Sequence, residues 1–435
     1  MNLPPTDTSP GLAAALRPQA GRPVWLQVGA LLDGSGPAVR RDCHLVYDAD
    51  GILYVGEAPP PADAVPAGRT APDRVLPGHT LLPGLIEAHA HLFLEGGEEN
   101  PDNRAAYLKL PAEELLARAA PRLSRLLAVG VVGMRDAGDK NGVGLALQKL
   151  YRESARGGMA YVDSPGAALH HQGRYGSFMG RAIEEQGSIE AAVAERVAAG
   201  AHRIKLIATG IINFEKGAVT APPQMPAEEL TAAVQAAAKW GRQTFAHCSG
   251  NNGVANCIAA RVDSIEHGFF VDEAQLAQMR DRDIAWVPTF SPVQFQVDAA
   301  AMMGWSDAVR AGLQRILDGH AASLVRAAAM GVRIVAGSDA GSHGVPHGHG
   351  FLRELELMEQ AGLSAGQILR AATGAGGERL GYAEEFGLLR RGAKPRFILT
   401  DAPVLTSVKN LRKPLLVAFD GAVIEGGDDA KRPGM

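Results

Sequence analysis

Residues 80–93 read TLLPGLIEAHAHLF, an apolar run that leads directly into two histidines, His89 and His91. Side chains two residues apart in a strand lie on the same face, so both imidazoles can reach one metal ion from the end of a buried strand. The alternative is that two polar residues simply end a strand. The rest of the chain must therefore decide whether this stretch belongs to a metal site.

The composition is that of a globular protein with a large core. The chain has 435 residues, of which 46% are hydrophobic and 21% charged. This length exceeds one ordinary domain, but it suits a barrel of roughly 250 residues or more with a smaller module. The formal net charge of −4 gives no indication of a nucleic-acid surface or of a polybasic membrane patch.

The three cysteines, Cys43, Cys248 and Cys257, are too few and too widely spaced for a disulfide framework or a cysteine zinc site. They favour a reducing compartment. The first residues have neither a basic start nor an apolar core, so they do not read as a secretory signal. No window approaches 18 apolar residues, as a membrane span would require. We expect a cytoplasmic protein whose residues 1–23 form an N-terminal arm.

The centre of the chain alternates apolar segments with helical patterns. Strands are expected at about 82–90, 130–136, 158–163, 203–208, 243–248, 262–266, 284–289 and 332–338. Several intervening helices end in glycine just before the next strand, at Gly130, Gly200 and Gly331. Eight strand–helix units in a row predict an α/β fold, a (β/α)8 TIM barrel over residues 81–385. The alternative is an open doubly wound sheet, but no Gly-x-Gly-x-x-Gly turn follows the first strand.

Both ends of the chain are rich in short strands. Residues 24–80 include a hairpin turn at residues 48–51, and residues 386–435 include another at Asp420-Gly421. The two segments flank a centre of a different pattern. We therefore predict one small β-sandwich domain built from 24–80 and 386–435.

Ligand-type residues recur at the ends of the expected strands. In a (β/α)8 barrel, chemistry takes place at the carboxyl ends of the strands, so these side chains would meet at one mouth. Lys205 alone could keep its ammonium in solvent, and Asp339 alone could cap a helix. Taken in order along the chain they favour a metal site, with the residues His89, His91, Lys205, His247, His267 and Asp339.

Several motifs together resemble the amidohydrolase superfamily of metal-dependent hydrolases. They are PGLIEAHAHL, GVVGMRDAGD, GAHRIKLIATG, FAHCSG, DSIEHG, AGSDAG followed by PHG, and LRAAT. The chain is most similar to the branch that holds imidazolonepropionase-like proteins, Xaa-Pro dipeptidases (prolidases) and ochratoxinase. The resemblance covers about residues 24–425. It implies a TIM barrel and two divalent metal ions, with zinc as the expected metal.

The resemblance also implies a role for each ligand. His89, His91 and Asp339 would bind the more buried metal, and His247 and His267 the second. Lys205 would react with carbon dioxide, and the resulting N6-carboxylysine would bridge the two metals. Asp339 would also carry protons, and His267 and Asp339 are the predicted catalytic residues. Elementary chemistry agrees, because an ammonium cannot bind a cation whereas a carbamate offers two oxygens.

The implied activity is hydrolysis of a C–N amide bond by a water that bridges two metals. A deaminase with a single metal is a rival, but such enzymes place a glutamate shortly after the fifth-strand histidine. Here Cys248, Ser249 and Gly250 follow His247. A cyclic-amide (imidazolone or lactam) hydrolase also competes. A non-catalytic scaffold is disfavoured because all six ligands are present.

The loop after the third strand carries the candidate substrate residues. His170 or His171 could donate to a substrate carbonyl, Arg174 could clamp a carboxylate, and Tyr175 could do either. The alternative is a loop tied by its own hydrogen bonds. An arginine here suits a dipeptide or N-acyl amino acid, as in prolidase-, carboxypeptidase- or ochratoxinase-like enzymes. The expected binding partner is a small-molecule amide, and we expect no nucleic-acid or membrane partner. We also expect the protein to form a homo-oligomer.

One stretch departs from the superfamily pattern. After Gly392 the expected Ala-Asp before a C-terminal strand reads Pro395-Arg396. The departure lies in the small β-domain, away from the expected metals. It therefore bears on local packing and not on catalysis.

Overall fold

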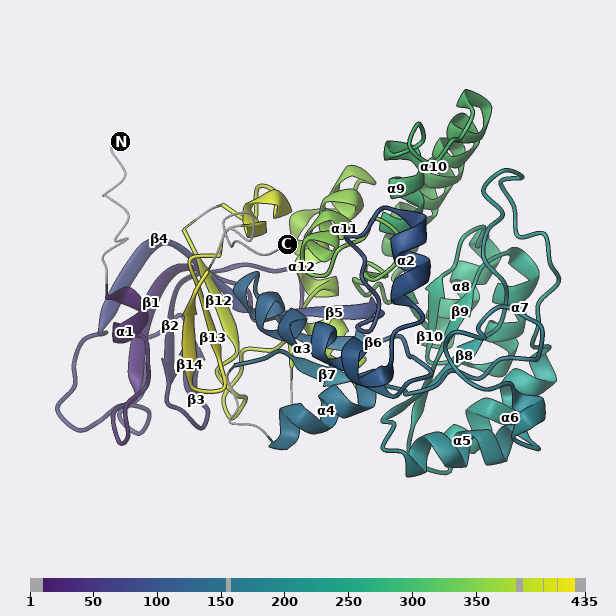
Figure 1. Ribbon diagram of the computed structural model, residues 1–435. Coiled ribbons are helices and arrows are strands. Elements are labelled where there is room, and N and C mark those ends of the chain that lie inside the picture. Colours follow the sequence, from purple (N-terminus) through teal and green to yellow (C-terminus); the bar gives the residue numbers. More distant parts are fainter. Residues whose placement is uncertain (1–10, 154–157, 381–385, 402, 413, 427–435) are drawn as a thin grey trace.

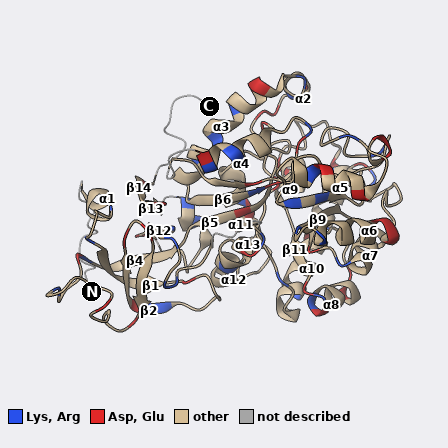
Figure 2. Cartoon of the chain, turned by 90° about the horizontal axis from the view of Figure 1, so that it is seen from below, with Lys and Arg blue, Asp and Glu red and all other residues tan. Residues whose placement is uncertain are grey.

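The computed structural model describes residues 11–153, 158–380, 386–401, 403–412 and 414–426. Its strands form an α/β arrangement of three sheets, with most helices around the two parallel ones (Figure 1). Lys and Arg are interspersed with Asp and Glu along the chain and form no single block (Figure 2). Within the described residues, no helix is long and apolar enough to cross a membrane.

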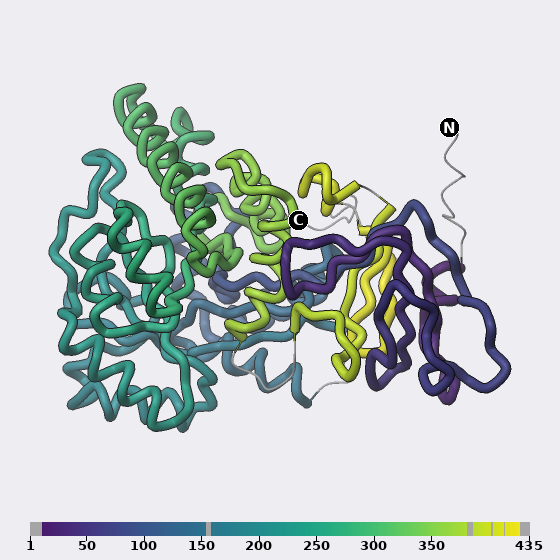
Figure 3. The backbone as a smooth tube through the Cα atoms, turned by 180° about the vertical axis from the view of Figure 1, so that it is seen from behind, coloured from purple at the N-terminus to yellow at the C-terminus, as the bar shows by residue number. Residues whose placement is uncertain are grey.

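A seven-stranded sheet unites strands from both ends of the chain, in the order β14-β13-β12-β4-β1-β2-β3. Figure 3 shows the purple N-terminal strands beside the yellow C-terminal ones. The strands are β1 (Val24–Leu31), β2 (Arg40–Tyr47), β3 (Ile52–Gly56), β4 (Arg74–Pro83), β12 (Phe397–Thr400), β13 (Leu416–Phe419) and β14 (Ala422–Glu425). Side chains such as Leu26, Leu45 and Phe397 form one buried apolar cluster on this sheet.

Both expected hairpins are present in this sheet. Strands β2 and β3 pair antiparallel, and the Asp48 carboxylate accepts the amides of Asp50 and Gly51 in the turn. Strands β13 and β14 pair antiparallel through Asp420 and Gly421, which both have positive φ. The turn residues therefore do what their chemistry predicts.

The described part of the expected N-terminal arm lies against the sheet. Leu12 of helix α1 (Leu12–Ala15) and the following Leu16 are buried in the same apolar cluster. The Tyr47 hydroxyl donates to the Leu16 carbonyl at 2.6 Å. Residues 11–16 are thus a packed part of this layer, and residues 1–10 lie outside the described residues.

Two parallel sheets hold the centre of the chain, in the orders β5-β6-β7 and β11-β10-β9-β8. Their strands are β5 (Leu85–Ala90), β6 (Val131–Asp136), β7 (Tyr161–Asp163), β8 (Arg203–Ile207), β9 (Gln243–Cys248), β10 (Ser264–His267) and β11 (Ala285–Val287). Seven of the eight expected central strands are confirmed. The eighth segment, 332–338, makes only an isolated bridge, at Ile334.

Backbone contacts join the parallel sheets on both sides. Leu169, downstream of β7, bridges Leu206 of β8 in parallel. On the other side Ile334 bridges Trp286 of β11, and Ala340 bridges Ala90 of β5. Backbone hydrogen bonds support the second junction, because the Ala88 amide donates to the Ala336 carbonyl and the Asp339 amide to His89. The carboxyl ends of the central strands therefore converge.

The helices follow the expected signals at their ends. Asp272 and Ser364 each form a capping box, and Gly130, Gly200 and Gly331 have positive φ before the next strand. The helices after α1 are α2 (Pro101–Tyr107), α3 (Ala112–Ala128), α4 (Val143–Glu153), α5 (Ile189–Ala198), α6 (Ala227–Ala238), α7 (Asn251–Ala260), α8 (Glu273–Asp281), α9 (Ser291–Asp298), α10 (Asp307–Met330), α11 (His349–Gln360), α12 (Ala365–Ala371) and α13 (Gly374–Gly377), with short 3₁₀ turns at Ile183–Glu185 and Val408–Arg412.

Candidate metal centre

Alternation along β5 directs Glu87 and His89 to one face, and His91 follows in the same period just after the strand. The imidazoles of His89 and His91 lie 5.8 Å apart, measured between ring centroids. Asp339 approaches both from the end of the last central segment. Its Oδ1 lies 3.6 Å from His89 Nε2 and 3.5 Å from His91 Nε2.

His89, His91 and Asp339 form a group that could hold a metal ion, since one ligand atom of each lies within 4.8 Å of the others. Neither His89 Nε2 nor Asp339 Oδ1 has a hydrogen-bond partner among the described residues, although both atoms are buried. Buried polar atoms are almost always satisfied, so two such atoms facing each other indicate that something else binds between them. Two imidazoles and a carboxylate are a donor set that suits zinc and similar divalent ions.

His247 and His267 form a second pair beside this group. Their ring centroids are 4.5 Å apart, and His267 lies 5.0 Å from His89 by the same measure. Lys205 on β8 is 1% exposed, and its Nζ has no hydrogen-bond partner among the described residues. The Nζ lies over the Phe245 ring at 4.7 Å. The six ligands predicted from the sequence thus project from neighbouring strand ends.

Burial holds these histidines in their neutral form. Desolvation is the largest cause, and it lowers the pKa of His91 and of His247 to about 3. The same cause lowers the pKa of His89 and His267 well below the usual value. A neutral imidazole is the form that binds a metal. Burial also raises the pKa of Asp339 and lowers that of Lys205, which disfavours the charged form of each.

Backbone strain concentrates at the site. His267, Thr289 and Asp339 each have a φ between 52° and 67°, a region that non-glycine residues rarely adopt. Such residues cost roughly 1–3 kcal/mol each and are retained where the surrounding structure requires them. In β10 the left-handed turn at His267 ends the strand alternation that places Ser264 and Glu266 on one face. The ring of His267 therefore reaches the same site as that of His89.

A buried network orients His89, and the sequence reasoning missed it. His89 Nδ1 contacts Glu266 Oε2 at 2.6 Å, so the proton between them leaves His89 Nε2 free to bind. Arg135 donates to both oxygens of Glu266 at 2.8 and 2.9 Å, and Ser264 Oγ donates to Oε1 at 2.6 Å. The signals in the sequence were that Glu266 sits inside the DSIEHG motif, next to a candidate ligand, and that Arg135 sits inside the GVVGMRDAGD motif.

Two smaller contacts support other ligands. His267 Nδ1 meets Thr289 Oγ1 at 2.7 Å, which leaves Nε2 of His267 for another partner. Glu87 accepts the backbone amides of His89 and Ser338 and also the Ser338 hydroxyl. Glu87 thereby ties β5 to the segment that carries Asp339. A single side chain, that of Glu87, therefore holds the segment of His89 and His91 against the segment of Asp339.

A pocket of about 240 Å³ opens directly over this centre. His247, His267 and Asp339 line its floor. Its other lining residues are Tyr175, Ile211, Ile212, Phe214, Ser249, Phe269, Thr289, Pro292, Val293, Gln296, Ser342 and His343. We call this hollow the inner pocket. A substrate bound in it would touch the candidate ligands directly.

Of the four predicted substrate residues, the structure brings only Tyr175 to the inner pocket, where its ring lies 5.0 Å from that of His247. The other three make contacts within their own loop and its neighbours. His170 faces the carbonyls of His171 and Gly180, and His171 lies between the carboxylates of Glu184 and Glu229. Arg174 donates to the Pro222 carbonyl at 2.7 Å.

Comparison with known proteins identifies relatives. The chain is 26% identical to ochratoxinase from Aspergillus niger over 440 residues, which cover 94% of this chain and 87% of that protein. It is 33% identical to imidazolonepropionase from a Polaromonas species over 161 residues, or 31% of this chain and 36% of that protein.

Solved structures share the fold. The crystal structure of A. niger ochratoxinase matches with a TM-score of 0.78 at 24% identity, covering 95% of this chain and 99% of that one. A Xaa-Pro dipeptidase with methionine bound in its active site matches with a TM-score of 0.77 at 24% identity, covering 93% and 100%.

The sequence model of one family, described as the amidohydrolase family, matches residues 80–424. This range runs from the strand that leads into His89 to the last hairpin, and it includes all six candidate ligands. The relatives carry the names ochratoxinase, imidazolonepropionase and Xaa-Pro dipeptidase. The chain therefore belongs to the amidohydrolase family and is a hydrolase acting on carbon–nitrogen bonds.

Proposed function

We propose that this protein is a binuclear metal-dependent amidohydrolase, built on a closed (β/α)8 barrel with a small β-domain from both ends of the chain. The parallel bridges from Leu169 to Leu206, from Trp286 to Ile334 and from Ala90 to Ala340 support the closure. They connect the two parallel sheets into a ring of eight segments. In such a barrel the site lies at the carboxyl ends of the strands, where these ligands are found.

One observation carries the proposal. Buried polar atoms of His89, Lys205 and Asp339 lack hydrogen-bond partners among the described residues. Asp339 lines the inner pocket with His247 and His267, the His89 ring lies 5.0 Å from that of His267, and the Lys205 charge lowers the pKa of His247. A protein interior rarely tolerates such atoms unless another group satisfies them. Divalent ions would satisfy the imidazoles and the carboxylate. Lys205, as N6-carboxylysine, would supply two oxygens where the ammonium supplies none.

His89, His91 and Asp339 would hold one ion, and His247 and His267 the other, with Lys205 between them. When bound, two zinc-like ions would acidify a water towards neutral pH and polarise the substrate carbonyl. Asp339 would accept the proton of the attacking water and transfer it to the leaving nitrogen. The raised pKa of its carboxyl, caused by burial, suits a group that must take up and release a proton near neutrality.

Tyr175 is the candidate for binding the substrate itself. Burial is the main cause that raises the pKa of its phenol, so the hydroxyl keeps its proton and can donate to a carbonyl oxygen. It comes from the loop after β7 and lies against His247. Ile212 and Ser249 extend the pocket floor around it. We assign Tyr175 to orienting the scissile amide.

The proposed substrate is a dipeptide or an N-acyl amino acid, and a dipeptide is the substrate named for the Xaa-Pro dipeptidase that shares the fold. A second candidate is a cyclic amide. It is favoured by the lining of the inner pocket, in which no described residue is arginine or lysine. A free carboxylate held away from the proposed metal ions would find no cationic side chain there.

The test is a substrate panel incubated with zinc and bicarbonate, with products read by mass spectrometry. The panel contains dipeptides ending in proline, arginine, lysine or apolar residues, N-acyl amino acids and cyclic imidazolones. Release of a free amino acid with two metal equivalents bound would support the first candidate. Ring opening without cleavage of any linear amide would support the second. Turnover with a single equivalent of metal would contradict the binuclear proposal.

A further inference from the structure

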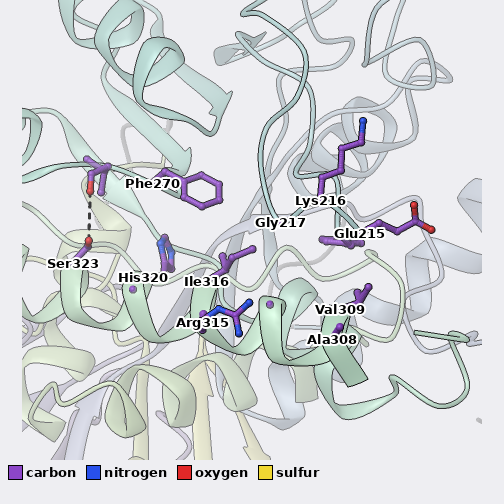
Figure 4. Close-up of a pocket in the computed structure, with 14 residues that line it drawn as sticks. Glu215, Lys216, Gly217, Phe270, Ala308, Val309, Arg315, Ile316, His320 and Ser323 are labelled. Atoms are coloured by element: carbon purple, nitrogen blue, oxygen red, sulfur yellow. Dashed lines mark hydrogen bonds between the residues drawn. The ribbon is translucent and has the colours of Figure 1, made fainter. Parts of the chain in front are cut away.

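Two hollows adjoin each other at the mouth and share Phe214. The inner pocket contains the candidate ligands. The second, which we call the outer groove, has a volume of about 540 Å³ and lies between α10, residues 214–217 and Phe270. Figure 4 shows Arg315 and Ile316 of α10 on one side of it and Lys216 on the other. The outer groove therefore offers cationic side chains that the inner pocket lacks.

We propose that the inner pocket is a subsite for an uncharged apolar group, an aromatic ring or a branched aliphatic chain, attached to one side of the scissile amide. This deepens the proposed function and rests on it for the identity of the bond that is cleaved. The specificity-determining residues are Ile211, Phe214 and Val293. The inference concerns the substrate class and involves none of the metal ligands.

The walls of the inner pocket carry the argument. Apolar side chains surround the polar floor: Ile211, Ile212, Phe214, Phe269, Pro292 and Val293. They come from three separate segments, the loop after β8, the turn after β10 and the start of α9. An apolar wall that faces the reacting centre stabilises a ligand by removing apolar surface from water.

Ile211 is the strongest single indication. Its side chain is 51% exposed, whereas the next residue, Ile212, is 5% exposed. A half-exposed isoleucine adds little to the stability of the folded chain. A ligand that covers it would bind more tightly, because the apolar surface of the isoleucine would then be removed from water. Because Ile211 stands at the edge of the pocket, the group that covers it must lie close to the candidate centre.

The electrostatics of the pocket oppose an anionic group. Asp339 is the only acidic or basic side chain, histidines aside, among the described lining residues. His343 at the rim is occupied, because its Nε2 contacts the Glu99 carbonyl at 2.6 Å. A carboxylate placed against the apolar walls, away from the proposed metal ions, would lose water without gaining a cationic side chain as partner. A neutral group incurs no such cost.

The volume fits one ring or one branched side chain. A cavity of about 150 Å³ lined by apolar residues is large enough for benzene. The inner pocket has about 240 Å³, so it holds such a group together with part of the amide. A longer substrate would continue past Phe214 towards the outer groove.

The experiment compares two probes that differ in one substituent, 4-fluoroacetanilide and 4-acetamidobenzoate. Binding is measured by ligand-observed saturation-transfer NMR on the full chain with zinc and bicarbonate, and hydrolysis is followed in the same samples. We expect the neutral anilide to bind at least about tenfold more tightly, since the carboxylate would be desolvated unpaired. Equal affinities would overturn the proposal.

Two matched lysine variants locate the effect. Ile211→Lys places a cation at the inner pocket and should reverse the preference between the two probes. Phe270→Lys makes the same change at another exposed apolar residue, 41% exposed, which lines only the outer groove. The preference should survive in Phe270→Lys. If both variants behave alike, or if neither changes the ratio, the inner pocket is not the subsite.

Ile211→Ser provides a second variant without a new charge, and it should weaken the anilide while leaving 4-acetamidobenzoate unchanged. The two failures can be told apart. Selective binding of the anilide without hydrolysis by any variant would count against the amide-hydrolase function while the subsite stands. Hydrolysis of both probes at equal rates would leave the function and remove the subsite.

Discussion

The candidate metal centre, at the mouth of the proposed barrel, and the seven-stranded sheet, here called the terminal sheet, each bury a cation, but the surroundings of the two cations differ. At the mouth, Lys205 lies over the Phe245 ring, and its Nζ has no hydrogen-bond partner among the described residues. At the sheet, Arg396 donates to both carboxylate oxygens of Asp420 at 2.7 and 3.1 Å and stacks over Phe386 at 4.0 Å. One cation is satisfied by the fold and the other is not.

The difference separates a structural charge from a functional one. A buried ion pair with good geometry roughly balances the loss of water, whereas an isolated buried charge is costly. The charge of Arg396 is therefore paired within the chain, and the departure from the superfamily pattern at Pro395-Arg396 is compensated locally by Asp420. Lys205 requires either a chemical modification or a bound ligand. Carbamate formation would be the modification, and metal ions would be the ligand.

The largest effect is expected when Lys205 is removed. Lys205→Ala should lose most bound metal and lower kcat/KM by more than about 10⁴-fold, the upper end of what loss of a general acid–base group costs. Metal is measured by plasma mass spectrometry and folding by circular dichroism. Lys239→Ala, at an exposed lysine that ends α6 and lines neither hollow, is the matched control and should change neither. Full activity in Lys205→Ala would end the binuclear proposal.

Asp339→Asn tests whether the mouth also uses its carboxyl for proton transfer. The amide retains a ligand oxygen, so much of the metal should remain while kcat falls by about 10²- to 10⁴-fold. Metal content and turnover are measured on the same preparation. Unchanged turnover would remove Asp339 as the proton carrier, and loss of all metal would show that the charge of Asp339 is needed for binding.

A substitution in the terminal sheet should lower the stability of the fold and leave catalysis unchanged. Arg396→Met leaves Asp420 buried without its cation, and we expect a loss of about 3–5 kcal/mol in the free energy of unfolding. Denaturant titration measures it. Arg396→Met combined with Asp420→Asn should regain a large part of the loss. A fall in kcat/KM for the folded fraction would show that the two regions are coupled.

A smaller effect is expected from the network behind His89. Glu266→Gln keeps the shape but removes the charge that pairs with Arg135 and orders His89. Metal affinity should fall by roughly 10- to 100-fold. Competition with a chelator measures it, and Glu228→Gln, at an exposed glutamate, is the control. Unaltered affinity would mean that β5 alone fixes the orientation of His89.

The smallest effect concerns His171, whose side chain is 21% exposed. Burial lowers the pKa of His171, but the carboxylates of Glu184 and Glu229 raise it more, so the net shift is upward. The stability gained by this loop is fully present below about pH 6.5 and is lost as pH rises through the raised pKa. It should be under about 1 kcal/mol. NMR titration of the His171 ring measures the pKa, and an unshifted value would contradict the pairing.

Much of the site could be predicted because strand ends carry their ligands in sequence order. His89, Lys205 and His267 were assigned from short apolar segments that the structure confirms as β5, β8 and β10. The substrate side was harder. Arg174 was expected to reach a substrate, and that role stays a prediction; its Nη2 donates to the carbonyl of residue 222, a contact that nothing in the local sequence reveals.

The network behind the ligands was missed for a related reason. Arg135 and Glu266 come from strands separated by more than a hundred residues, and each alone resembles an ordinary charged residue. Their pairing depends on tertiary packing, which strand periodicity does not encode. The eighth segment, 332–338, was expected as a full strand, but it makes only one isolated bridge to β11, and the bridge to β5 follows at Ala340.

The order of strands in the terminal sheet has a consequence for synthesis of the chain. Strand β4 pairs with β1 on one side and with β12 on the other, so its second edge stays open until residues 397–400 have left the ribosome. At about 5–20 residues per second this takes tens of seconds, during which the whole central region is translated. An open strand edge invites pairing with other chains. A nascent chain of this protein is thus most exposed to misassembly before its last strands appear, and chaperones would act in that interval.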